Sequence, residues 1–336
     1  MRRRIFPARS GARLGAYKIE RLLARGLRTD VYRALHEPSG IKVALRCLDP
    51  KRAQDPIHAA QAEDHFRAEL DRVLSLQGPG IPTVLDGGVT DGILWLATEV
   101  KRGQPVAITS GRISYIDSLG STLAIVDALL VAHRKHGLVH GDLRPNSVLV
   151  HAWEEASVLG IGCAGLFGIS RSLARVTPLY RAPEQLTGNA PVDVRSDIYS
   201  FGMILYALLA GRHPFADLEG RLPDKAALVT IAEHGGSAFL VPLPKLLGPN
   251  AAVVWKVIQK ATHPDPDKRM ESWAQVRMEV GGAALFSLGK SAAERRRAGA
   301  FLVRLHERQG TGAQARAILA SAAEQEELEL AKGLIQ

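Results

Sequence analysis

The residues that could take part in chemistry are concentrated in a few short segments. Asp142 is a carboxylate that could accept a proton, and Arg144 is a nearby cation that could neutralise an anionic group. Arg46 adds a second cation after a glycine-containing turn, ARGLRTDVY, at 24–32. A carboxylate and two cations of this kind could position an anionic ligand and neutralise its charge. The segments that stand out are HGDLRPNSVLV (His140–Val150), TPLYRAPEQL (Thr177–Leu186), SDIYSFGMILYALLAGRHPF (Ser196–Phe215) and DPDKR (Asp265–Arg269).

The composition is that of a packed globular chain, with 46% hydrophobic and 23% charged residues among 336. The apolar stretch around Met203–Ala210 is shorter than the roughly 18 to 20 residues that cross a bilayer, so we expect no membrane span. The two cysteines, Cys47 and Cys163, exclude a disulfide framework and indicate a reducing, cytoplasmic location.

The net charge of +9 is concentrated at the N-terminus, where residues 1–15 contain five arginines and no acid. The other 321 residues therefore carry +4. Such an arm could touch nucleic acid or an anionic membrane, but we expect a solvated terminus and predict no nucleic-acid partner.

The elements that must position these side chains follow from hydrophobic periodicity and from the turn residues. We expect an α+β chain with a small β-rich lobe that contains one helix, followed by a larger helical lobe. The last stretch, 291–335, predicts a helical hairpin broken at Gly310–Gly312. The expected strands are 17–24, 30–35, 42–48, 83–87 and 93–99, and the expected helices are 57–76, 114–136, 196–210, 251–262 and 272–281.

The segments named above, in this order, resemble the eukaryotic-like serine/threonine protein kinases that bacteria also carry. The resemblance covers about residues 17–280 and implies the bilobal protein-kinase-like fold. We therefore expect a basic arm at 1–15, a kinase-like domain at 16–280 and an α-helical extension at 281–336. The lobes of the domain would be 16–102 and 103–280.

The resemblance implies a nucleotide cleft whose phosphate-binding parts are altered here. Ala24, Gly26 and Thr29 stand at the three positions that are glycines in the family, and a Cβ restricts backbone approach to phosphates. Arg46 stands at the phosphate-binding lysine, and a guanidinium is not a conservative replacement there. Its expected carboxylate partner is Glu69, as a structural ion pair.

The catalytic loop and the metal positions are altered as well. By resemblance, Asp142 is the base for the substrate hydroxyl, and Arg144 replaces a lysine that steadies the γ-phosphate. Gly141 replaces an arginine that docks a phosphorylated activation segment. Ser147 replaces a magnesium-binding asparagine, and Gly160 replaces the aspartate that holds the bridging metal. Glycine offers no side-chain oxygen, so we predict no metal site.

The packing residues of the family are retained. Val31, Ala44 and Leu149 match the adenine-contacting positions, with Thr98 as gatekeeper and Glu99–Lys101 as hinge. Each apolar residue could equally be plain core. The resemblance also implies that Asp197 braces the catalytic loop and that Glu184 pairs with Arg269. The activation-segment residues Ser170, Ser172 and Thr177 are candidate phosphorylation sites.

The chain lacks the family's metal-binding and phosphate-binding residues but keeps its packing residues. This combination favours a pseudokinase. Such a protein would signal by binding a protein partner, with ATP bound weakly, without Mg²⁺, or not at all. One alternative is an atypical but active serine/threonine kinase, supported by Asp142 and Thr177. Another is a scaffold that recruits a partner through the C-terminal helices.

Overall fold

The computed structural model describes residues 10–25, 29–48, 56–109, 115–151, 155–167, 180–187, 191–212, 214–216, 240–248 and 251–287. Gly26, the activation-segment residues Ser170, Ser172 and Thr177, and the hairpin expected at 291–335 lie outside these ranges.

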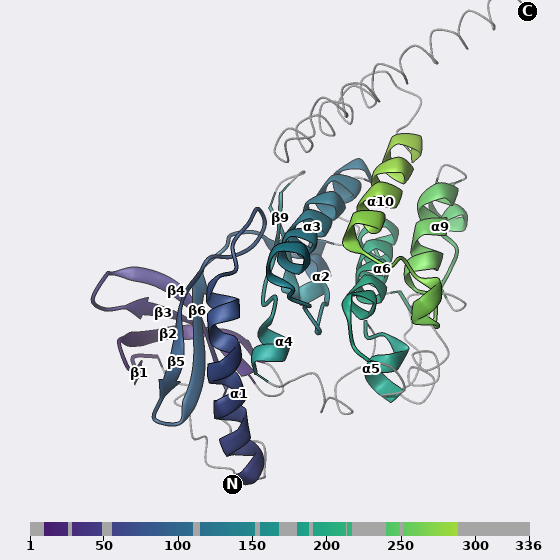
Figure 1. Cartoon of the computed structure of the whole chain (residues 1–336). Coiled ribbons are helices and arrows are strands. Elements are labelled where there is room, and N and C mark those ends of the chain that lie inside the picture. The colour runs from purple at the N-terminus through teal and green to yellow at the C-terminus, as the bar shows by residue number, and fades with distance from the viewer. Residues whose placement is uncertain are drawn as a thin grey trace, which may run out of the picture.

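The first lobe is an antiparallel sheet with the strand order β1-β2-β3-β4-β6-β5 (Figure 1). Alternating apolar side chains, including Tyr17, Tyr32 and Leu45, form a buried cluster on one face. Residues 13–14, which fall within the expected basic arm, form β1, where Leu14 pairs with Tyr17 of β2. The strands are β1 (Arg13–Leu14), β2 (Tyr17–Arg25), β3 (Thr29–His36), β4 (Ile41–Leu48), β5 (Val84–Thr90) and β6 (Ile93–Glu99).

One helix, α1 (Pro56–Leu74), belongs to this lobe and packs against β5. Its buried residues Phe66 and Val73 recur at helical spacing and join the core of the second lobe. The helix ends two residues before the expected boundary, ahead of the Gly78–Pro82 segment. α1 therefore lies between the sheet and the C-terminal lobe (Figure 1).

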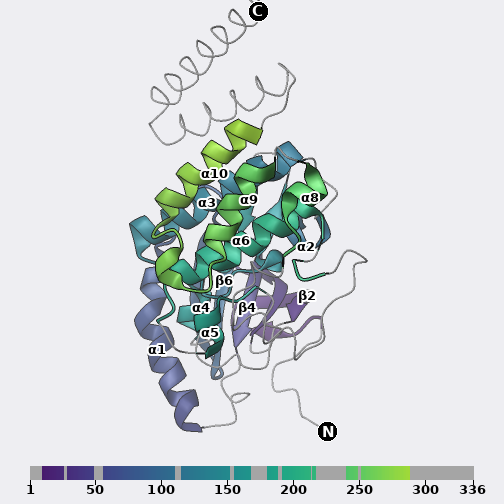
Figure 2. The same cartoon turned by 90° about the vertical axis from the view of Figure 1, so that its right-hand side faces the viewer.

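The second lobe is built around α6 (Val194–Ala210), which is apolar and buried on nearly every side. Asp193 caps its first turn, and α3, α9 and α10 pack around it (Figure 2). None of the described helices is long and apolar enough to cross a bilayer. The remaining elements are β7 (Gln104–Pro105), α2 (Val106–Thr109), α3 (Tyr115–His136), η2 (Pro145–Ser147), β8 (Val148–Val150), β9 (Ala156–Val158), α4 (Cys163–Leu166), α5 (Pro183–Thr187), α8 (Leu243–Leu247), α9 (Ala252–Ala261), η5 (Pro266–Lys268) and α10 (Trp273–Ser287).

The expected α+β arrangement of a β-rich lobe followed by a helical lobe is thus confirmed.

Candidate nucleotide cleft and catalytic loop

The expected nucleotide-binding residues of the first lobe lie on one face of the sheet. Val31 is the cross-strand partner of Arg46, and Ala44 lies two residues before Arg46 on the same strand. Residues paired across strands, and residues two apart along a strand, share a face. Ala24 pairs with Val31, and Thr98 pairs with Ala44, which extends the same face over four strands.

The hinge segment follows β6, and its charged side chains bind each other. Lys101 Nζ lies 2.8 Å from Glu99 Oε2, which also accepts a hydrogen bond from the Thr83 amide. The hydrogen bond from Lys101 lowers the pKa of the Glu99 carboxyl. Leu149, expected to contact adenine from the other lobe, is half-buried on β8.

Arg46 lies against Gly160 and not against Glu69. Its Nη1 donates to Thr29 Oγ1 at 3.2 Å, and a Cβ added to Gly160 would lie 3.0 Å from its Nη2. The carboxylate of Glu69 instead lies 3.5 Å from Arg72 Nη1. The expected Arg46–Glu69 ion pair is therefore wrong: the guanidinium extends into the space that the missing side chain at 160 leaves, and Arg72 is one helical turn from Glu69.

Asp142 is held by two arginines. Its Oδ2 lies 3.3 Å from Arg144 Nη2, and its Oδ1 accepts a hydrogen bond of 3.2 Å from Arg181 Nη2. The side chain of Arg181 is only 8% exposed, whereas that of Asp142 is 26% exposed, so the carboxylate is only partly shielded from solvent. Each carboxylate oxygen of Asp142 is therefore already bound by an arginine of the protein.

The Ser147 hydroxyl is hydrogen-bonded to the backbone of Arg144. Its Oγ donates to the Arg144 carbonyl at 2.7 Å and accepts from the Arg144 amide at 3.0 Å, within η2. Asn146 is exposed on the same short 3₁₀ turn.

The residues present do not fit a magnesium ion. Magnesium takes oxygen ligands and is usually held by one or two carboxylates in addition to phosphates, and Gly160 supplies no side-chain oxygen. The Ser147 hydroxyl and the Asp142 carboxylate are both engaged by protein groups. Across the part of the chain that the structure describes, no group of three or more His, Cys, Asp or Glu side chains is placed to hold a metal ion.

Asp197 braces the catalytic loop from α6, as expected. Its carboxylate accepts hydrogen bonds from the amides of His140 at 2.6 Å and Gly141 at 2.8 Å. Burial raises the pKa of Asp197 to about 7, against the opposing effect of these two bonds.

His140 is buried beside Asp197 and is neutral. Burial lowers its pKa to about 4. Its Nδ1 accepts from the Asp142 amide at 3.3 Å, so we assign the ring proton to Nε2, which lies 3.0 Å from the Leu159 carbonyl oxygen.

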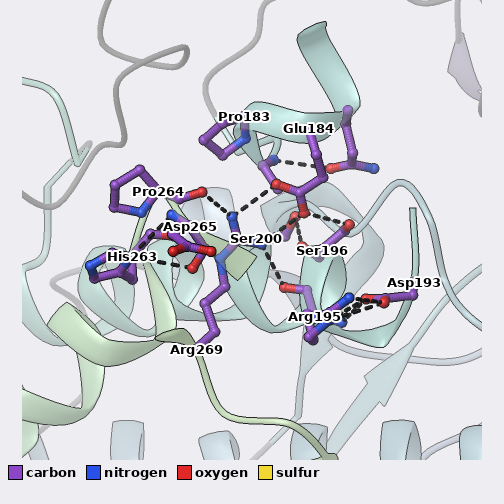
Figure 3. A network of polar contacts seen from close by, with 12 residues as sticks. Pro183, Glu184, Asp193, Arg195, Ser196, Ser200, His263, Pro264, Asp265 and Arg269 are labelled. Atoms are coloured by element: carbon purple, nitrogen blue, oxygen red, sulfur yellow. Dashed lines mark hydrogen bonds and ion pairs between the residues drawn. The ribbon is translucent and has the colours of Figure 1, made fainter. Parts of the chain in front are cut away.

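The expected Glu184–Arg269 pair is confirmed (Figure 3). Two parallel hydrogen bonds of 2.7 and 2.8 Å join the side chains, and both are almost fully buried. Ser196 Oγ donates to Glu184 at 2.6 Å, and Arg269 donates to the carbonyls of His263 and Pro264. Burial raises the pKa of Glu184, but the hydrogen bonds from Arg269 and Ser196 outweigh it and lower the pKa overall.

Sequence reasoning missed Arg181 and Arg72. Arg181 lies within the segment TPLYRAPEQL (Thr177–Leu186). A cation in that segment could have been considered as a partner for the Asp142 carboxylate. Arg72 lies three residues after Glu69, and that helical spacing could have identified it as a competitor for the carboxylate. Both cysteines are free and buried.

The protein kinase domain family matches residues 17–279. A probable serine/threonine-protein kinase of Streptomyces coelicolor is 31% identical over 279 residues, which is 79% of this chain and 39% of that protein. PknA of Mycobacterium tuberculosis is 30% identical over 248 residues, which is 70% of this chain and 54% of PknA. The chain therefore spans about two-fifths to one half of these curated relatives.

Solved structures agree with this match. The kinase domain of M. tuberculosis PknI superposes with a TM-score of 0.62 at 25% identity, covering 82% of this chain and 98% of that domain. The chain belongs to the protein kinase domain family and has its two-lobed α+β fold. Its sequence relatives among the curated proteins include bacterial serine/threonine kinases.

Proposed function

We propose that this kinase-family domain is a pseudokinase that acts in signalling by binding a protein partner. The observation that carries the proposal is the guanidinium of Arg46 lying against Gly160, with its Nη2 3.0 Å from the place of a Cβ. By resemblance, this is the position of the aspartate that holds the bridging metal. A cation thus lies where the family places the anion that binds the metal.

Electrostatics supports the same conclusion. Removing a metal carboxylate leaves the charge that develops on the phosphates unanswered, and loss of a comparable clamp costs about 10³-fold in phosphoryl transfer. Asp142 retains the position of the base, yet Arg144 and Arg181 both bind its carboxylate. A substrate hydroxyl would therefore have to compete with these two guanidinium groups for the carboxylate oxygens.

The sheet face could still receive a nucleotide that carries no metal. Val31 and Ala44 lie on the same face as Arg46, so adenine contact and phosphate neutralisation come from one surface. Arg46 and Arg144 could then offset the phosphate charge that Mg²⁺ offsets in an active kinase. Bound ATP would act as a ligand and not as a phosphate donor.

A radiolabelled transfer assay with generic protein substrates and Mg²⁺ tests the proposal. We expect the wild type to transfer no more phosphate than the Asp142→Ala control. Transfer that requires Mg²⁺ and is abolished by Asp142→Ala would overturn the proposal in favour of an atypical active kinase.

A thermal-shift titration with ATP, with Mg²⁺ or with EDTA, tests the role of the metal. We expect either no shift or a shift that is the same in both conditions and that Arg46→Ala reduces. An ATP shift that appears only with Mg²⁺ would contradict metal-independent binding. The double variant Arg46→Lys, Gly160→Asp should gain Mg²⁺ dependence, because it restores the missing carboxylate and shortens the cation.

A further inference from the structure

The carboxyl end of α3 is bound by a side chain from the other lobe. Arg72 of α1 donates from Nε to the His136 carbonyl at 3.1 Å and from Nη2 to the Gly137 carbonyl at 2.5 Å. His136 is the last residue of α3, and Gly137 follows it. One guanidinium therefore links α1, the only helix among the described residues of the first lobe, to the C-terminal end of α3, a 22-residue helix of the second lobe.

The chemistry of this contact is that of a helix cap supplied from another helix. The last carbonyls of a helix lack partners within it, and they lie at the negative end of the helix dipole. A guanidinium offers several donors in one plane and can satisfy two carbonyls at once. Gly137 leaves room for it, since an added Cβ would lie 2.8 Å from Arg72 Nη2 and the φ of Gly137 is +59°.

Other contacts hold α1 to the second lobe at its middle and just past its end. At the middle of α1, His65 Nε2 lies 2.7 Å from the carbonyl oxygen of Gly165 in α4, and the centroid of the Phe66 ring lies 5.4 Å from that of Phe167. Just past its end, Ser75 Oγ lies 3.2 Å from His136 Nδ1. α1 and α4 lie side by side (Figure 1).

None of these contacts uses the groups expected to couple α1 to a nucleotide. Arg46 donates to Thr29, and Glu69 faces Arg72 on its own helix. The contacts that hold α1 to the second lobe are thus made with backbone carbonyls, the Phe167 ring and the His136 side chain, which are present whether or not a ligand binds.

We infer that Arg72 is a positioning residue that fastens α1 to the C-terminal lobe independently of nucleotide. The role of Arg72 does not depend on the proposed function. One consequence does rest on it: a partner protein would bind the same arrangement of the two lobes with and without ATP.

Hydrogen exchange measured by mass spectrometry on the full chain tests the role of Arg72. We expect Arg72→Ala to speed amide exchange in α1 and at 137–139 at least tenfold while leaving α6 unchanged. Arg67→Ala is the matched control, since Arg67 lies on the same helix, is 61% exposed and pairs with Glu63 of α1. Exchange in Arg72→Ala equal to that in Arg67→Ala would overturn the inference.

The unchanged exchange of α6 separates positioning from general loss of stability. If Arg72→Ala unfolds the whole chain, Arg72→Lys replaces it, because a single ammonium cannot span both carbonyls and should give an intermediate, local effect. Wild-type exchange throughout α1 in Arg72→Lys would then overturn the inference.

A second set of exchange measurements, with ATP added, tests whether the position of α1 is independent of nucleotide. We expect wild-type exchange in α1 to change less than twofold when ATP is added with EDTA or with Mg²⁺. A tenfold slowing would show that nucleotide positions α1 and would overturn the inference. The transfer assay described above is read separately, so phosphate transfer would overturn the proposed function without touching the result for Arg72.

Discussion

Arg46 and Gly160 show how two replacements far apart in the chain become one feature in space. The φ of Gly160 is +80°, a backbone conformation that side chains other than glycine adopt at a cost. Because Gly160 has no side chain, it also leaves the space that the Arg46 guanidinium occupies. A shorter lysine at 46 or a carboxylate at 160 would each alter this fit, so the two positions should be changed together.

At the residue scale, the Glu184–Arg269 pair provides a stability prediction. Glu184→Gln removes the charge that compensates a fully buried guanidinium, and an unpaired buried charge costs about 3 to 5 kcal/mol. We expect the free energy of unfolding to fall by that amount in urea denaturation.

The control for this variant is Glu63→Gln, which removes an exposed pair with Arg67 within α1. Exposed pairs of this kind contribute about 0.3 to 0.5 kcal/mol. Equal losses in the two variants would contradict the assignment of Glu184 and Arg269 as a buried anchor of this lobe.

At the scale of elements, the contact between α6 and α9 depends on a residue without a side chain. A Cβ added to Gly202 in α6 would lie 2.7 Å from Ala261 Cβ and 2.8 Å from Thr262 Cγ2. Gly202→Ala should therefore destabilise the protein by about 1 to 3 kcal/mol through overpacking, despite the better helix propensity of alanine.

Gly281 in α10 is the matched control for this helix contact. No atom lies within 4 Å of a Cβ added there, so Gly281→Ala should stabilise the protein by up to about 1 kcal/mol. Urea or thermal unfolding of both variants measures the contrast. The same sign for both changes would show that close approach of α6 and α9 is not the cause.

At the scale of the whole molecule, stability should depend on pH through the buried His140. Its pKa is about 4 in the folded protein and near 6.5 when unfolded. Between these values the unfolded state binds more protons, so stability present above pH 6.5 is lost as the pH falls toward 4. Asp197, with its pKa raised to about 7, acts in the opposite direction over this range.

The contribution of His140 is isolated by comparison with His140→Gln, which can still donate a hydrogen bond toward the Leu159 carbonyl but does not titrate. From pH 6.5 to 4.5 the wild type should lose about 2 kcal/mol more of its free energy of unfolding than the variant. Urea denaturation at several pH values measures this, and parallel pH profiles would contradict a neutral buried histidine.

Much of the architecture was predictable from local pattern. Apolar periodicity predicted the strands β2–β4 and the buried α6 to within two residues, and the family resemblance implied the Glu184–Arg269 pair and the Asp197 brace. These features depend on spacing along the chain, or on pairings that the family resemblance implied.

The partners of individual charges were not predictable. The sequence by itself determined which side chains exist: a cation at 46, a carboxylate at 69 and no side chain at 160. Only the tertiary structure decided that Arg46 extends toward Gly160 and that Arg72 reaches across to the end of α3. The physical reason is that a long, flexible cation binds whichever acceptor or free space the packed backbone brings within reach, and separation in sequence does not encode that distance.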